Sequence, residues 1–168
     1  MSRKSKFVAH GALIAALYVV LTYGQNLIFP GSATMAIQFR VSEALCVLAL
    51  FTPAAISGLS VGCLLFNISY AMALPLDPVV GTLATLLATA GMYFGRNLKI
   101  KGYPLPALLL PAVVNGILVG WELSVYVGGG FWLNAAYVAA GEAAVLLSLG
   151  TVLYYALRGR RLGRSLQF

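Results

Sequence analysis

The sequence contains four acidic residues among 168, and each lies inside or at the end of an apolar segment: Glu43, Asp77, Glu122 and Glu142. A carboxyl group at membrane depth is costly, and it normally faces a partner, a cavity or a ligand. We therefore expect the acids to border a polar pocket. Such a pocket favours a ligand that donates hydrogen bonds or carries positive charge.

The acids also have structural interpretations. Asp77 is followed by proline, which is typical of a helix start, so a capping role is the favoured interpretation there. Glu43 lies three residues after Arg40 and has the right spacing to pair with it. Glu122 and Glu142 have no basic residue at their expected depth. They either share a proton with each other or bind a substrate, and we favour the substrate.

Neutral polar side chains and both tryptophans fall near the same ends of the apolar segments as the acids. Asn115 precedes Glu122 by seven residues, or two helical turns, so the two side chains share a helix face. Trp121 and Trp132 either border the pocket or belong to the aromatic belt of a membrane protein. Asn67 either bridges two helices or contacts a ligand. The candidate substrate-binding residues are Gln38, Arg40, Glu43, Asn67, Asn115, Trp121, Glu122, Trp132, Asn134 and Glu142.

The sequence carries no pattern typical of an enzyme or a metal centre. It has no zinc-protease motif, nucleophile elbow, Walker A loop or dinucleotide fingerprint. Cys46 and Cys63 lie in apolar segments without the spacing of metal ligands. We expect no catalytic residue, no metal and no cofactor. Without a nucleotide-binding loop, the chain cannot power uphill transport by itself.

The composition is that of a protein surrounded by lipid. The sequence is 61% hydrophobic and 9% charged, whereas about a quarter of the residues in a soluble domain are charged. The net charge of +7 comes mainly from basic residues that gather in residues 3–6, 96–101 and 158–164. Basic clusters beside apolar segments follow the positive-inside rule, and this distribution argues against nucleic-acid binding.

The apolar stretches predict an all-α membrane protein with six transmembrane helices, in a single domain over residues 1–168. About 20 apolar residues cross the hydrocarbon layer, so residues 41–74 are long enough for two helices. Thr52 followed by Pro53 supplies the break between them. Six crossings place the N- and C-termini and all three basic clusters in the cytoplasm. The predicted spans are residues 7–28, 35–52, 53–74, 78–95, 104–127 and 131–157.

Small residues spaced four apart predict close packing between helices. In lipid, such pairs let two helix backbones approach because no bulky side chain separates them. They are common in membrane helices and therefore indicate packing more than function. The pairs are Ala12/Ala16, Gly58/Gly62, Gly91/Gly95, Gly116/Gly120 and Ala140/Ala144.

Several segments together resemble the QueT family. The most specific runs from Gln38 to Glu43, because its polar pattern is unusual in a membrane span. The resemblance implies a substrate-binding subunit of an energy-coupling factor (ECF) transporter, with six helices and both termini inside, in the plasma membrane of a prokaryote. The implied partners are a transmembrane coupling subunit and two cytoplasmic ATPase subunits. The similar segments are residues 36–45, 51–56, 62–67, 81–85, 114–116 and 122–123.

The resemblance also implies a ligand class, the 7-deazaguanine precursors of queuosine. A deazaguanine presents a ring N–H beside an exocyclic amine, and one carboxylate can accept both, as it does with arginine. Glu122 or Glu142 is the candidate for this contact. Asn115 or Gln38 is the candidate for the ring carbonyl, and one of the two tryptophans for stacking on the ring.

The resemblance implies a docking surface as well. In such subunits the first helix carries a small Ala-x-x-x-Ala patch that contacts the coupling subunit, and Ala12 and Ala16 fill that role here. The alternative to this function is a stand-alone proton-coupled carrier of small molecules, in which Glu122 and Glu142 relay protons.

Overall fold

The structure is a computed structural model that describes residues 2–30 and 39–158. This part of the chain is helical apart from loops and one isolated β-bridge between Ile100 and Tyr103, so the all-α prediction is confirmed for it. η1 is a 3-10 helix and η2 is a short π-helical segment. In chain order the elements are α1 (Arg3–Ile28), η1 (Val41–Leu50), α2 (Ala54–Ser69), α3 (Asp77–Gly95), α4 (Leu105–Tyr126), α5 (Phe131–Val145), η2 (Leu146–Gly150) and α6 (Thr151–Arg158).

Four helices in the described ranges are long and apolar enough to cross a membrane. They are α1, α3, α4 and the continuous helix Phe131–Arg158, which consists of α5, η2 and α6. The predicted spans 35–52 and 53–74 correspond to two shorter apolar helices, η1 and α2. A count of six crossings remains a prediction.

The second predicted span differs most from the structure. η1 has 10 residues and begins at Val41, and a 3-10 helix of that length rises about 20 Å. The hydrocarbon layer is about 30 Å thick. Residues 35–38 of the predicted span lie outside the described residues. Most of η1 is buried, and it contacts every other described helix, because its apolar side chains face neighbouring helices on all sides.

Local signals in the sequence set the breaks between helices as predicted. The hydroxyl of Thr52 accepts a hydrogen bond from the backbone N–H of Ala54, where α2 begins, at 3.3 Å. α3 begins at Asp77, with proline in its first turn. The three glycines at 128–130 have φ angles of 86°, 82° and 81°. Glycine adopts this left-handed conformation without steric cost, and the turn separates α4 from α5.

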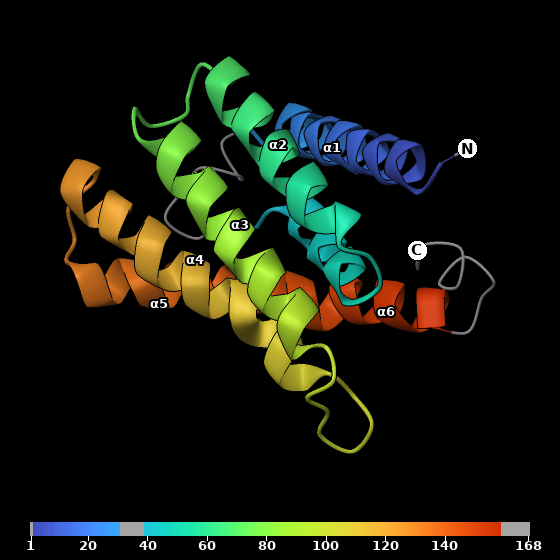
Figure 1. The fold of residues 1–168 in the computed structure, drawn as a ribbon. Coiled ribbons are helices and arrows are strands. Elements are labelled where there is room, and N and C mark those ends of the chain that lie inside the picture. The colour runs from blue at the N-terminus through green and yellow to red at the C-terminus, as the bar shows by residue number, and fades with distance from the viewer. Residues whose placement is uncertain (1, 31–38, 159–168) are drawn as a thin grey trace.

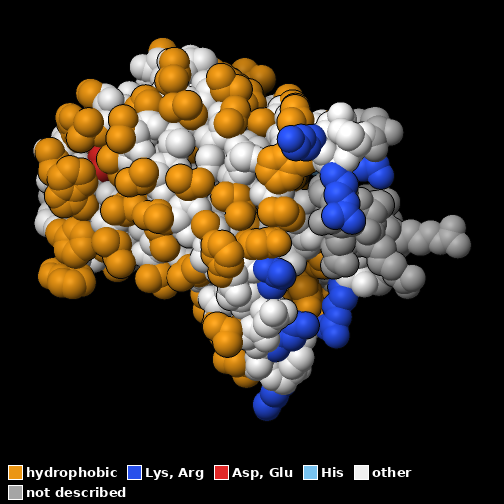
Figure 2. Space-filling view, in the orientation of Figure 1, with side chains coloured by type: hydrophobic (Ala, Val, Ile, Leu, Met, Phe, Trp, Pro, Cys, Tyr) orange, Lys and Arg blue, Asp and Glu red, His pale blue; other side chains and the backbone are white. Residues whose placement is uncertain are grey.

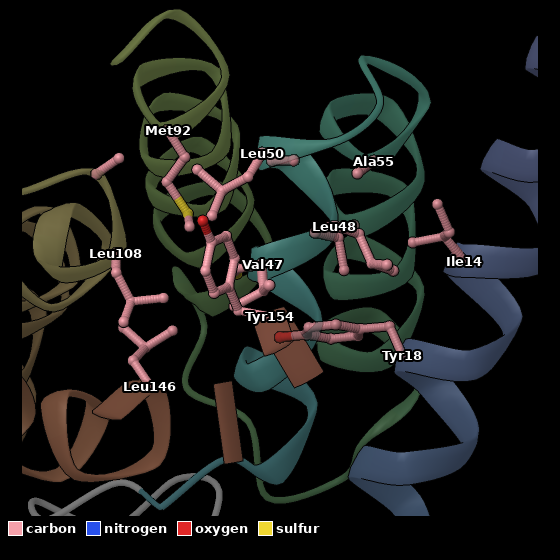
Figure 3. Packing of buried hydrophobic residues seen from close by; sticks show 14 of the residues in the cluster. Ile14, Tyr18, Val47, Leu48, Leu50, Ala55, Met92, Leu108, Leu146 and Tyr154 are labelled. Atoms are coloured by element: carbon pink, nitrogen blue, oxygen red, sulfur yellow. The ribbon is translucent and has the colours of Figure 1, made fainter. Parts of the chain in front are cut away.

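Consecutive helices pack on one another, from α1 through α5, and η1 lies among them (Figure 1). Figure 3 shows Val47 and Leu48 of η1 between Tyr18 of α1 on one side and Leu108 and Leu146 on the other. All five side chains are buried. Close packing of this kind allows little movement of a side chain or its helix, so η1 is held in a fixed place.

Small residues bring two pairs of helices into close contact, as expected. A Cβ atom added to Gly58 of α2 would lie 2.6 Å from the backbone oxygen of Gly11 in α1. A Cβ atom added to Gly120 of α4 would lie 2.6 Å from the Cα of Ala135 in α5. Both distances are too short for a side chain, so these helix pairs require glycine at the contact.

Lysine and arginine side chains gather at one end of the molecule, near the N-terminus and the loop between α3 and α4 (Figure 2). The rest of the surface in this view is mainly hydrophobic, as contact with lipid tails requires. The positive-inside rule assigns the basic end to the cytoplasm. That orientation remains a prediction.

Candidate functional site

A small polar cavity lies where the start of η1 meets α3, α4 and α5. Its volume is about 20 Å³, which is room for about one water molecule. Four of its lining side chains are buried although they are charged or carry an amide. The described residues that line it are Arg40, Glu43, Gly81, Thr85, Asn115, Val119 and Glu142.

Asn115 of α4 and Glu142 of α5 are joined directly across this cavity. The side-chain nitrogen of Asn115 donates to both carboxylate oxygens of Glu142, at 2.7 and 2.6 Å. The sequence predicted both residues as candidates but not their contact. The geometry shows that the Glu142 carboxylate faces a donor with both oxygens, which is the arrangement that a pair of ligand N–H groups would need.

Glu43 is held by donors from two elements. The Tyr18 hydroxyl of α1 donates to Oε1 at 2.8 Å, and the Cys46 thiol of η1 donates to Oε2 at 3.2 Å. Sequence reasoning missed both donors. Cys46 lies three residues after Glu43 and was identifiable by spacing, whereas Tyr18 is 25 residues away and gave no signal.

Arg40 is buried in the same region, and its guanidinium lies 5.9 Å from the centre of the Phe66 ring. It interacts electrostatically with all four acids of the chain: Glu43, Asp77, Glu122 and Glu142. The expectation that no basic residue lies near the last two acids is therefore wrong. The reason is that η1 lies at the centre of the bundle. Arg40 directly precedes η1 and is therefore buried there as well.

Gln25 of α1 fixes the chain on either side of Arg40. Its side-chain oxygen accepts from the backbone N–H of Val41 at 2.6 Å, and its nitrogen donates to the backbone oxygen of Phe39. Gln25 was not among the candidate residues. It positions the site without lining the cavity.

Asp77 does not cap α3, and the capping interpretation is wrong. Its carboxylate accepts from the backbone N–H of Leu74, in the turn before the helix, at 2.6 Å, and no side chain caps α3. Glu122 is fully buried, and no N–H or hydroxyl group in the described part of the chain donates to its carboxylate oxygens, whose side-chain contact is with the carboxyl group of Asp77. Asp77 is the acid that acts most strongly on Glu122, so the two carboxyl groups form a second polar position.

Asn67 bridges two helices, in line with its structural interpretation. Its side-chain nitrogen donates to the backbone oxygen of Asp77 at 2.9 Å and so ties α2 to the start of α3. Its side-chain oxygen is buried and has no hydrogen-bond partner among the residues described. A Cβ atom on Gly81 would lie 2.7 Å from the Asn67 nitrogen, so this contact also depends on glycine.

The other described candidates do not line the cavity. Trp121 and Trp132 are 48% and 83% exposed, as residues of an interfacial belt would be. Asn134 donates to the backbone oxygen of Gly128 at 2.7 Å and holds the turn between α4 and α5. Gln38 lies outside the described residues.

The family described as QueT transporter matches this chain over residues 8–159. No curated protein and no solved structure matches it. The family match covers nearly the whole chain and includes every described residue that lines the cavity.

Proposed function

Because this chain belongs to the QueT transporter family, we propose that it is the substrate-binding subunit of an ATP-driven ECF importer. In this proposal it captures 7-deazaguanine precursors of queuosine from outside the cell. Its family and its four membrane-length apolar helices identify it as a multi-pass membrane protein that transports a solute. The substrate and the assembly with ECF subunits are the proposed part.

One observation carries the proposal, which is the polar cavity lined by Arg40, Asn115 and Glu142 inside a mainly apolar bundle. Buried polar groups are costly in a membrane protein and mark a ligand or ion pathway. The cavity combines a carboxylate, an amide and a guanidinium. These groups can accept the N–H groups of a deazaguanine and donate to its ring carbonyl.

A bicyclic ring is much larger than the present cavity, so binding must rearrange the contacts that close it. Asn115 and Glu142 both line the cavity, and the bond between them is the contact that a ring would replace. We infer that Glu142 accepts the ring N–H and the exocyclic amine in place of the Asn115 amide. Asn115 is then free to donate to the ring carbonyl, so each group keeps a hydrogen-bond partner.

The proposed partners are a transmembrane coupling subunit and two cytoplasmic ATPases, which supply the energy. α1 contacts only α2 and η1 among the described elements, so much of its surface is open to lipid or to another protein. Ala12 and Ala16 are exposed on that surface. Two small residues one turn apart allow close approach of a second helix, which supports docking of the coupling subunit there.

A proton-coupled carrier remains the alternative function, and the contact between the buried carboxyl groups of Glu122 and Asp77 favours it. In such a carrier this pair would hold and release protons during transport. Uptake that persists in cells lacking the ATPases, and collapses with an uncoupler, would establish the carrier. Uptake that requires the ATPases would exclude it.

Titration calorimetry on the purified protein tests the substrate. Guanine, cyano-deazaguanine and aminomethyl-deazaguanine are the three ligands to compare, and at least one deazaguanine should bind more tightly than guanine. If the protein shows a cooperative thermal transition but binds neither deazaguanine, the proposed substrate is wrong.

A further inference from the structure

The polar position at Asp77 and Glu122 is separate from the cavity around Glu142, and the proposed recognition of the ring does not use it. We propose that Asp77 and Glu122, together with the side-chain oxygen of Asn67, form a second subsite that takes a protonated amine on the ligand. The inference rests on the proposed function and extends it, because it specifies which form of the ligand the protein prefers.

The residues around Asp77 have an excess of buried hydrogen-bond acceptors. Both carboxylate oxygens of Glu122 and the side-chain oxygen of Asn67 are buried, and no N–H or hydroxyl group among the described residues donates to them. Both residues adjoin Asp77, Asn67 through the hydrogen bond to its backbone and Glu122 through its carboxyl group. An ammonium group brings three N–H donors and no acceptor, so it matches what these atoms lack.

The second subsite is continuous with the cavity around Glu142. Glu122 lies three residues after Val119 and seven after Asn115 on α4, so all three share one helix face. Asp77 lies one helical turn before Gly81 on α3. Since α3 packs on α4 and Val119, Asn115 and Gly81 line the cavity, the second subsite continues the same polar face. Asn115 and Glu122 are seven residues apart, which is about 10 Å along α4. A ligand that consists of a ring and a short arm can span this distance, because both side chains reach inward toward it.

The balance of buried charges also favours a cation at the second subsite. Arg40 acts on all four acids, so a single guanidinium faces four carboxyl groups. A ligand with a neutral substituent leaves Glu122 buried without a cation of its own. A ligand with an aminomethyl arm places its ammonium beside Asp77 and Glu122. An ion pair in a buried site is much stronger than in water, so the site should distinguish the aminomethyl form from the cyano form.

The test compares the two deazaguanines by calorimetry in wild type, Glu122→Gln and Asp77→Asn. Both substitutions keep the shape of the side chain and remove its charge. Each should weaken binding of the aminomethyl form at least about tenfold, the usual scale for a lost hydrogen bond to a charged group. The cyano form should change by less than about threefold. Equal loss for both ligands, or no loss for the aminomethyl form, overturns the subsite.

Two further variants control this comparison. Glu142→Gln should weaken both deazaguanines, because it removes the contact to the ring that they share. Ser124→Ala lies on α4 two residues after Glu122 and bonds only the backbone of its own helix in the described structure, so it should bind both ligands as wild type does.

A second measurement does not depend on deazaguanines. Methylammonium at millimolar concentration should raise the unfolding temperature of the wild type and leave that of Glu122→Gln unchanged, with tetramethylammonium, which has no N–H donor, as the control. If the wild type binds no deazaguanine but methylammonium still stabilises it selectively, the proposed substrate fails and the amine subsite stands. If methylammonium stabilises both proteins equally or neither, the subsite is wrong, whichever nucleobase binds.

Discussion

The side-chain nitrogen of Asn115 lies 2.7 Å from Oε1 and 2.6 Å from Oε2 of Glu142, so one amide joins α4 to α5 inside an apolar bundle. Both residues line the candidate cavity, and their contact also satisfies a buried carboxylate. Stability and ligand binding therefore depend on the same pair of residues. Separate experiments can measure the two effects, thermal unfolding for stability and calorimetry for binding.

Replacing Asn115 by leucine should destabilise the protein. The change keeps the approximate size of the side chain but removes the donor to a buried carboxylate, which costs about 1–3 kcal/mol. We expect a lower unfolding temperature in detergent. Adding Glu142→Met should recover part of the loss, since replacing both partners by apolar groups leaves no unsatisfied oxygen. A double variant less stable than Asn115→Leu would contradict this account of the pair.

The hydrogen bond from Tyr18 to Glu43 should stabilise the position of η1. Tyr18 is fully buried and donates to Oε1 of Glu43 at 2.8 Å, so Tyr18→Phe should cost roughly 1–3 kcal/mol and lower the unfolding temperature. Tyr23→Phe is the matched control, because the Tyr23 hydroxyl donates to Ser69 at an exposed position. An equal fall in both variants would show that burial of the Glu43 contact is not the cause.

Gly120→Ala should disrupt the packing of α4 on α5. The added Cβ would lie 2.6 Å from the Cα and 2.7 Å from the backbone nitrogen of Ala135, and overpacking of this kind costs about 1–3 kcal/mol. Gly24→Ala is the control, since its Cβ would meet nothing within 4 Å. Because Gly24 is a helical residue of α1, alanine there should be neutral or stabilise by about 0.5–1 kcal/mol. Thermal unfolding of both variants tests the contrast, and a stable Gly120→Ala protein would show that the helices can separate without cost.

Features that depend on a few adjacent residues could be predicted from the sequence. The break at Thr52, the helix start at Asp77 and the turn at residues 128–130 follow from local conformational preferences of threonine, proline and glycine. Long apolar runs likewise predicted α1, α3, α4 and the last helix to within a few residues. Of the candidate residues, four line the cavity together: Arg40, Glu43, Asn115 and Glu142.

Features that depend on distant contacts could not be predicted. No local pattern indicates the 3-10 conformation of η1 or its burial among all the other described helices. The burial of Arg40 is a consequence of that position. Similarly, Asp77 has the sequence pattern of a helix cap, but its carboxylate bonds the preceding turn instead. Trp132 is the second residue of α5, and its side chain is exposed. Its position in the sequence does not reveal which way the ring points.

Bulky residues on the exposed face of α1 should separate substrate capture from transport. Ala12→Leu with Ala16→Leu places two large side chains on the exposed face of α1, so the fold and ligand binding should be unchanged. If that surface docks on the coupling subunit, the added volume prevents close approach of the helices, and uptake by cells should be lost. The matched control is Ala136→Leu with Ala140→Leu, a second exposed pair one turn apart, on α5. Uptake should persist in the control, and intact uptake in the α1 variant would show that the coupling subunit docks elsewhere.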